Sequence, residues 1–315
     1  MPEVLSSESK VRSATSAWAK MGIVDSISKA TRTPALTRIR PAMCIERFSL
    51  LERPAVHTMC KGGAFMQPKE LMANDKIIVL QAQLGEWDNL NHLIVCTKTN
   101  QAVIVDPFDG DYWLSMCEQR GWVLKQIWLT HSHWDHSKGV EAVKQALGDS
   151  VLVKCHAFER QRGWEGEVDE EWVHEANSHV NLSCGELRFE AHCTPGHTPG
   201  HTTFVGEGVV ISGDCLFLGR CGRTDLFGGD PVAQRSTLHY LREHMQHLPG
   251  DTLVLPGHQY QLEDGQTPTT MKISEVLQTN EALLALDDDQ AWAALPFLAF
   301  DDSMAERARR QRAQQ

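Results

Sequence analysis

The most constraining feature of the sequence is a run of histidine and aspartate residues at positions 131 to 136. The run contains His131, His133, Asp135 and His136 within six positions. Imidazole nitrogen and carboxylate oxygen are the ligands that borderline ions such as Zn²⁺ prefer. On a loop, the alternating spacing directs His131 and His133 the same way, and Asp135 and His136 can then turn toward a second point. We therefore expect one loop to serve two metal ions.

Short apolar strands and helical segments alternate along the chain around this run. The hydrophobic pattern predicts strands at 76–80, 91–96, 102–106, 126–130 and 151–154, and a second series at 186–192, 202–205, 209–212 and 252–255. It predicts helices at 111–120, 139–146, 232–247 and 271–286. The residues with metal-binding chemistry fall just past strand ends, where open α/β architectures place their sites.

Three single ligand candidates follow the run, each after a predicted strand. His197 lies in the turn-rich segment 194–201, Asp214 follows Gly213, and His258 follows Pro256-Gly257. Glycine at 213 lets the backbone approach an ion closely. Any one of these alone is more simply a turn residue, but their order behind the histidine run predicts that they complete one metal site.

With these residues the chain resembles the glyoxalase II and persulfide dioxygenase branch of the metallo-β-lactamase superfamily, from about residue 75 to about residue 285. The resemblance implies an α/β (α+β) fold, a four-layer αβ/βα sandwich with the metals in the cleft between its sheets. It implies that one ion is held by His131, His133 and His197, and the other by Asp135, His136 and His258. Asp214 would bridge both ions, and Asp135 and Asp214 are the expected catalytic residues.

The first activity that this resemblance implies is hydrolysis of a small thioester or ester, as in a hydroxyacylglutathione hydrolase. Two Zn²⁺ ions sharing a hydroxide would lower its pKa to about 7 and make it a nucleophile at neutral pH. This interpretation rests on the presence of all seven ligands. Asp106 is expected to support the metal loop without binding metal itself.

The alternative activity is that of a persulfide dioxygenase with one Fe²⁺. His131, His197 and Asp214 alone form the two-histidine, one-carboxylate triad of mononuclear iron oxygenases, which leaves positions open for oxygen and a thiol substrate. In this interpretation Arg223 pairs with a substrate carboxylate and Tyr260 donates a hydrogen bond near the metal. The alternative for the Arg223 side chain is an ion pair with Asp225 or Asp230.

Composition restricts the partners and the compartment. The formal net charge of −11 argues against a nucleic-acid ligand and against binding to anionic membranes, so a small molecule is the expected partner. No stretch approaches the roughly 18 apolar residues of a membrane span. Nine cysteines without a CxxC pair indicate free thiols in a reducing compartment, here the cytoplasm, and Cys215 is expected to pack into the core behind Asp214.

The ends of the chain differ in composition from the part between them. Residues 1–72 are expected to form a leader, residues 73–290 the catalytic domain, and residues 291–315 a tail. No acidic residue lies between Asp25 and Glu46, a pattern typical of an organellar transit peptide. A flexible leader, or a start codon upstream of the functional beginning, explains the same composition. The basic run at 307–312 is expected to be a solvated helix end.

Overall fold

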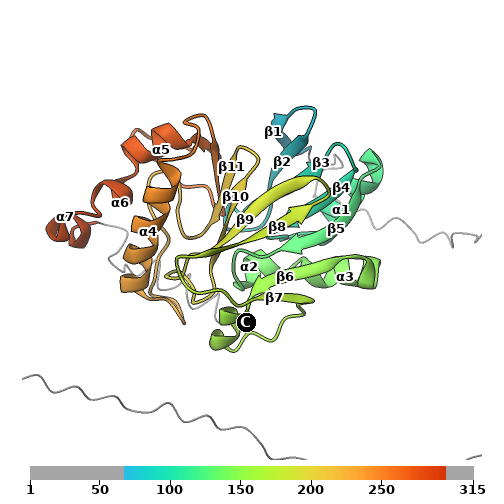
Figure 1. Ribbon diagram of the computed structural model, residues 1–315, viewed down its shortest axis with the longest axis horizontal. Helices are drawn as coiled ribbons and strands as arrows, with labels where there is room; N and C mark the ends of the chain where they lie inside the picture. Colours follow the sequence, from blue (N-terminus) through green and yellow to red (C-terminus); the bar gives the residue numbers. More distant parts are fainter. Residues whose placement is uncertain (1–66, 296–315) are drawn as a thin grey trace, which may run out of the picture. The chain divides into compact units, whose positions relative to one another are not determined.

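The computed structural model describes residues 67–295, which fold into two β-sheets and the helices that cover them (Figure 1). The leader up to residue 66 and the basic run at 307–312 lie outside the described residues. Within the described part, the first sheet has seven strands in the order β1-β2-β3-β4-β5-β6-β7. The second has six strands in the order β13-β12-β11-β10-β9-β8.

The first sheet changes from antiparallel to parallel pairing at β4. Its strands are β1 (Lys69–Ala73), β2 (Ile77–Gln83), β3 (Leu90–Cys96), β4 (Gln101–Val105), β5 (Val123–Trp128), β6 (Leu152–His156) and β7 (Glu170–Trp172). The pairs from β1 to β4 are antiparallel, and those from β4 to β7 are parallel. Because parallel strands need a crossover connection, α1 (Gly110–Arg120) joins β4 to β5, and α2 (Trp134–Ser137) and α3 (Val140–Leu147) join β5 to β6.

The second sheet is a meander with one parallel addition. Its strands are β8 (His179–Cys184), β9 (Leu187–Cys193), β10 (Thr202–Gly206), β11 (Val209–Gly213), β12 (Leu253–Pro256) and β13 (Met271–Lys272). Strand β12 pairs in parallel with β11 after the crossover helix α4 (Pro231–Met245). The short helices α5 (Ile273–Thr279), α6 (Glu281–Leu284) and α7 (Asp289–Ala293) follow.

Three apolar cores define the layers. The core between the sheets joins Ile94 and Trp128 of the first sheet to Phe189 and Phe204 of the second. A second core packs α1 and α3 on the outer face of the first sheet, and a third packs α4 to α7 on the outer face of the second. In Figure 1 these two helix groups accordingly lie on opposite sides of the strands. The arrangement confirms the four-layer αβ/βα sandwich.

The predicted strands and the first three predicted helices are confirmed to within a few residues, but two expectations are wrong. The strand expected at 76–80 is not the first, because β1 (Lys69–Ala73) precedes it and pairs with β2. The closing helix expected at 271–286 is divided. Its first two residues form β13, which pairs with β12, and Asn280 then leaves the helical conformation at φ −71° and ψ 113°. The buried Asn280 side chain caps α6 through Leu283 N and donates to Phe217 O, which ends α5 at Thr279.

Candidate metal centre

The loops that carry the predicted ligands all follow the carboxyl ends of strands. His131 and His133 lie after β5, His197 after β9, Asp214 after β11, and His258 after β12. Asp135 and His136 belong to α2, a single helical turn that begins directly after His133. That turn changes the direction in which the side chains point, so one short segment presents side chains to two clusters.

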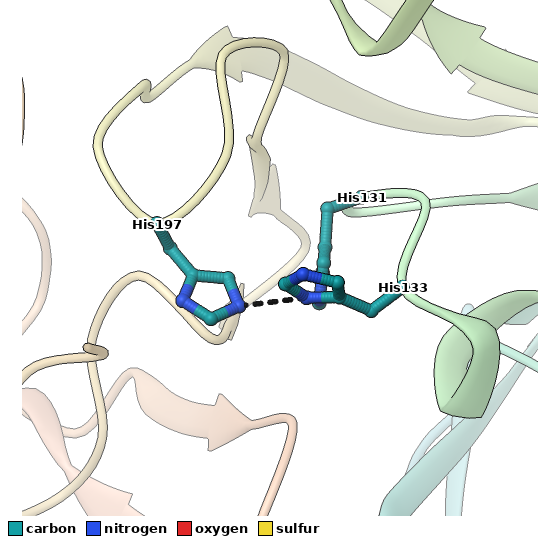
Figure 2. Close-up of side chains that lie close together, drawn as sticks. All are labelled: His131, His133 and His197. Atoms are coloured by element: carbon teal, nitrogen blue, oxygen red, sulfur yellow. Dashed lines mark hydrogen bonds between the residues drawn. The ribbon is translucent and has the colours of Figure 1, made fainter. Parts of the chain in front are cut away.

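His131, His133 and His197 form the first cluster. One ring nitrogen of each lies within 4.8 Å of the others, and His197 Nε2 is 3.0 Å from His133 Nδ1. Figure 2 shows the two histidines of the β5 loop facing His197, which projects from the opposite loop. All three side chains are buried, and His131 Nε2 has no hydrogen-bond partner in the described part of the chain.

Asp135, His136 and His258 form the second cluster. His136 Nε2 is 3.1 Å from His258 Nε2, and His258 Nε2 is 3.3 Å from Asp135 Oδ2. Asp135 Oδ1 is buried and has no hydrogen-bond partner among residues 67–295. Asn89 Nδ2, which sequence analysis missed, donates to Asp135 Oδ2 at 2.8 Å and so fixes the orientation of the carboxylate.

Asp214 lies between the two clusters. Its Oδ2 is 3.6 Å from His197 Nε2 and 3.2 Å from His258 Nε2, and its Oδ1 is 3.5 Å from His136 Nε2. A side chain at Gly257 would collide with Asp214 Oδ1, so glycine is needed there. One carboxylate therefore contacts both clusters.

Three of the histidines are oriented by a bond at the nitrogen that faces away from the centre. The bonds are His136 Nδ1 to Asp106 Oδ2 at 2.9 Å, His197 Nδ1 to Arg223 O at 2.7 Å, and His258 Nδ1 to Trp87 O at 2.8 Å. Each of these bonds leaves Nε2 directed at the centre, an arrangement typical of metal-binding histidine.

Asp106 lies beside the two clusters, in contact with the loop after β5 and with His136, and it forms a further possible metal group with His131 and His136. Its carboxylate accepts hydrogen bonds from Thr130 N at 2.7 Å and Thr130 Oγ1 at 2.6 Å, in addition to its bond with His136. It adopts a left-handed backbone with φ 51°. Asp106 thus fixes both the start of the metal loop and the ring of His136.

Glu159, a second residue that sequence analysis missed, joins the two histidine loops. Its Oε1 accepts from Gly200 N at 2.9 Å and its Oε2 accepts from Ser132 N at 2.9 Å. The carboxylate is fully buried beside Arg162, whose Nη1 donates to Ser132 Oγ at 2.7 Å. This bridge holds the loop of His131 and His133 against the loop of His197.

The electrostatics of the centre match those of a site that binds a cation. Burial would raise the pKa of Asp214, but His258 and His136 hold it well below its usual range. Burial would lower the pKa of His136, but Asp214, Asp135 and Asp106 raise it to about 9. Burial and the neighbouring histidines lower the pKa of His131 well below its usual value. The centre thus combines carboxylates that stay charged with buried imidazoles, some of which stay neutral.

The donor set fits borderline divalent metal ions. Imidazole nitrogen and carboxylate oxygen converge here in a buried volume, and one ligand atom each of His131, Asp135 and Asp214 makes no hydrogen bond among the described residues. A buried polar atom without a partner costs free energy, which binding of an ion at the centre would recover.

A pocket opens beside the clusters. Its lining includes three residues of the clusters, His197, Asp214 and His258, and several aromatic and basic side chains: Trp87, Phe217, Arg220, Arg223 and Tyr260. Arg223 and Tyr260, which the sequence suggested for substrate binding, therefore both line this pocket. Arg223 also pairs with Asp225, through Nε to Oδ1 and Nη2 to Oδ2 at 2.5 Å each, as one of the two alternatives for its side chain proposed. Cys215 is fully buried in the core below α4, as predicted.

A two-sheet sandwich with a histidine and aspartate centre at its strand ends defines a class of metal-binding α/β proteins. A family model described as the metallo-beta-lactamase superfamily matches residues 86–258. The chain belongs to the metallo-β-lactamase superfamily.

Curated relatives give the comparison more detail. A hydroxyacylglutathione hydrolase of Polaromonas sp. is 34% identical over 177 residues, which cover 55% of this chain and 63% of the relative. A hydroxyacylglutathione hydrolase of Pseudomonas fluorescens is 32% identical over 210 residues, which cover 66% and 74%. The chain thus spans somewhat less than two thirds of the first of these relatives.

Solved structures share the fold. The crystal structure of ETHE1 from Myxococcus xanthus is similar with a TM-score of 0.53 and 26% identity, over 70% of this chain and 92% of that one. Between residues 67 and 295, no helix combines the length and the apolar character needed to cross a membrane.

Proposed function

We propose that the protein is a metallohydrolase that cleaves a small thioester or ester, with two Zn²⁺ ions at the centre. The position of Asp214, within 3.2 to 3.6 Å of ligand atoms in both clusters, is the observation that carries the proposal. In the proposal His131, His133 and His197 hold one ion, and Asp135, His136 and His258 hold the other. Asp214 bridges them, and Asp135 and Asp214 are the catalytic carboxylates. The curated relatives named hydroxyacylglutathione hydrolase support the same activity.

The metal ions, when bound, would polarise the substrate carbonyl and make water nucleophilic at neutral pH. The chain's own residues hold the ligands of both ions in place. The hydrogen bond from Asn89 keeps Asp135 in one orientation, and Asp214 N donates to His201 Nε2 at 3.2 Å, which fixes the backbone at the bridge. Preorganised ligands of this kind need little rearrangement during the reaction.

The lining of the pocket beside the centre favours a substrate with an anionic thiol carrier such as glutathione. Arg223 and Tyr260 are the proposed substrate-binding residues, because both line the pocket next to the metal ligands. A guanidinium group binds a carboxylate by two parallel hydrogen bonds, and Arg223 already makes such a pair with Asp225. A substrate carboxylate would share or displace Asp225. Trp87 and Phe217 would cover the apolar part of the carrier.

The alternative is a persulfide dioxygenase with one Fe²⁺ on His131, His197 and Asp214. The presence of these three side chains in one buried centre favours it, since they form the usual iron triad. The remaining four ligand candidates are then unexplained, which is why hydrolysis is the main proposal. We also propose a cytoplasmic location, which is supported by seven free, buried cysteines among the described residues.

The test compares the two activities in one protein. Full-length protein loaded with zinc is given a hydroxyacyl glutathione thioester, and thiol release is measured with a thiol-reactive dye. We expect turnover, with a loss of at least about 100-fold in kcat/KM for His258→Ala, because removing a ligand costs more than the 10–100-fold typical of a supporting residue. His239→Ala, which removes a half-exposed histidine of α4, is the matched control and should retain activity.

A different result would contradict hydrolysis. The hydrolase proposal fails if no thiol is released and the iron-loaded protein consumes oxygen when glutathione persulfide is added. Oxygen consumption that persists in His258→Ala would assign the reaction to the three-ligand iron site.

A further inference from the structure

A second group of side chains whose chemistry suits a metal ion lies away from the centre, on the outer face of the second sheet. His179 of β8 and His192 of β9 are direct partners across the antiparallel pair, so their side chains share one face. Glu190 lies two residues before His192 in the same strand and therefore points to that face as well. The intervening Ala191 faces the core between the sheets.

Helix α4 covers this face and adds two more side chains. Tyr240 and His244 are four residues apart, so they lie on the same side of the helix. Tyr240 Oη is 2.6 Å from His192 Nδ1, and the rings of His192 and His244 have centroids 4.5 Å apart. Three histidines and one glutamate from two strands and a helix therefore meet between the sheet and α4.

The three histidines are arranged around the Glu190 carboxylate. Oε2 lies 3.0 Å from His192 Nε2 and 3.5 Å from His244 Nε2, and Oε1 lies 3.6 Å from His179 Nε2. Zinc bonds of about 2.0–2.1 Å in a tetrahedron place ligand atoms about 3.3 Å apart. The two longer separations are too long for good hydrogen bonds, and all three are close to the spacing of ligand atoms around one ion.

Burial and hydrogen bonding fix the orientation of the histidine rings in this group. His192 is fully buried, and its contact with Tyr240 through Nδ1 turns Nε2 toward Glu190. A ring held at one nitrogen, with the other directed at a carboxylate, is the arrangement found at metal-binding histidine. His244 Nε2 is buried and has no hydrogen-bond partner in the described part of the chain. His179, with a side chain 41% exposed, leaves a path from solvent.

We propose that His179, Glu190, His192 and His244 form a second, peripheral site for one divalent cation of the Zn²⁺ type. The site shares no residue with the centre at the strand ends. Ligand atoms of His179, Glu190 and His192 lie within 4.8 Å of one another, and His244 as the fourth ligand would close the set, which is typical of a structural rather than a catalytic zinc site. The bound ion connects the carboxyl-terminal half of α4 to the β8–β9 edge of the sheet and stabilises the folded protein, because it binds only where these three elements are assembled.

The test counts zinc ions per chain. Full-length wild type, the double variant His179→Asn/His244→Asn and the control His239→Asn are dialysed against buffers with a series of fixed free Zn²⁺ concentrations, and bound zinc is measured by elemental analysis. We expect wild type and control to bind one zinc more per chain than the double variant, and the affinity of that site to fall at least about 100-fold in the double variant. Zinc added to protein with a filled centre should raise the thermal unfolding midpoint of wild type but not of the double variant.

Equal zinc binding by wild type and the double variant would overturn the proposal and leave the group a hydrogen-bonded surface cluster. Circular dichroism shows whether the double variant is folded. If the double variant is unfolded, zinc binding by the single variant His179→Asn is compared with that of wild type instead. This exposed side chain contributes little to packing, so the single variant should fold.

Discussion

Glu159→Gln tests how the two histidine loops are held together. The substitution preserves the size of the side chain but leaves one acceptor oxygen where the carboxylate has two. In the structure those two oxygens accept from Gly200 N and Ser132 N at 2.9 Å each. The new amide NH₂ must therefore face one of these N–H groups, and the buried guanidinium of Arg162 loses its carboxylate.

The magnitude follows from these losses. A buried charge whose partner is removed costs about 3–5 kcal/mol, and a buried donor left without an acceptor costs about 1–3 kcal/mol. The losses occur at one site and are not additive, so we expect the free energy of unfolding to fall by about 3–5 kcal/mol. Because the bridge also orients the loops of His133 and His197, zinc affinity at the centre should fall about 10–100-fold.

The assay is urea unfolding of metal-free protein, followed by zinc titration of the same samples. Glu171→Gln is the matched control, since Glu171 accepts from Arg160 Nε at 2.8 Å in an ion pair whose side chains are 37% exposed. The free energy of unfolding of Glu171→Gln should fall by no more than about 1 kcal/mol. If Glu159→Gln costs no more than Glu171→Gln and binds zinc like wild type, then Glu159 does not hold the loops.

Three further perturbations test other parts of the account. Asp106→Asn keeps a residue that tolerates the left-handed backbone but weakens the bond to His136, so zinc affinity by titration should fall about 10–100-fold while the far-ultraviolet circular dichroism is unchanged. Burial lowers the pKa of His92 to about 3, so its neutral form stabilises the fold fully above about pH 6.5, and this contribution is lost as pH falls toward 3. Urea unfolding should show the stability difference between His92→Gln and wild type changing by about 2 kcal/mol in favour of the variant between pH 7 and pH 5, and an unchanged difference would contradict the burial argument. Arg223→Gln should raise KM for a glutathione thioester about 10-fold with little change in kcat, whereas an unchanged KM would show that Arg223 serves only its ion pair with Asp225.

The parts of the fold with strong local patterns could be predicted from the sequence. Strands β3 and β4 are apolar runs with a turn between them, and both are almost wholly buried. Strand β8 does alternate, with Val180, Leu182 and Cys184 toward the core and exposed residues between them, so the sequence carried a signal for it that the prediction missed. Strand β1 is an edge strand with mostly exposed side chains, and its position depends on pairing with β2, which local pattern does not reveal. The break at Asn280 likewise depends on its bond to a distant carbonyl, Phe217 O.

Some residues of the centre could likewise be predicted from the sequence, and others could not. Its seven ligand candidates could be proposed from residue type and order, because each follows a strand. Asn89 and Glu159 could not, since each acts on a residue distant in sequence: Asp135 lies 46 positions from Asn89, and Ser132 lies 27 positions from Glu159. The peripheral cluster combines an alternating strand pair with a helical four-residue spacing, and only the packing of α4 on the sheet brings these patterns together.

Anomalous diffraction from crystals of the zinc-loaded protein tests the central claim most directly. We predict two peaks at the zinc edge in the buried centre, about 3.5–4 Å apart. One should lie about 2.0–2.2 Å from ligand atoms of His131, His133 and His197, and the other at the same distance from Asp135, His136 and His258, with Asp214 bound to both. A centre that holds one metal, bound by His131, His197 and Asp214 alone, would contradict the account.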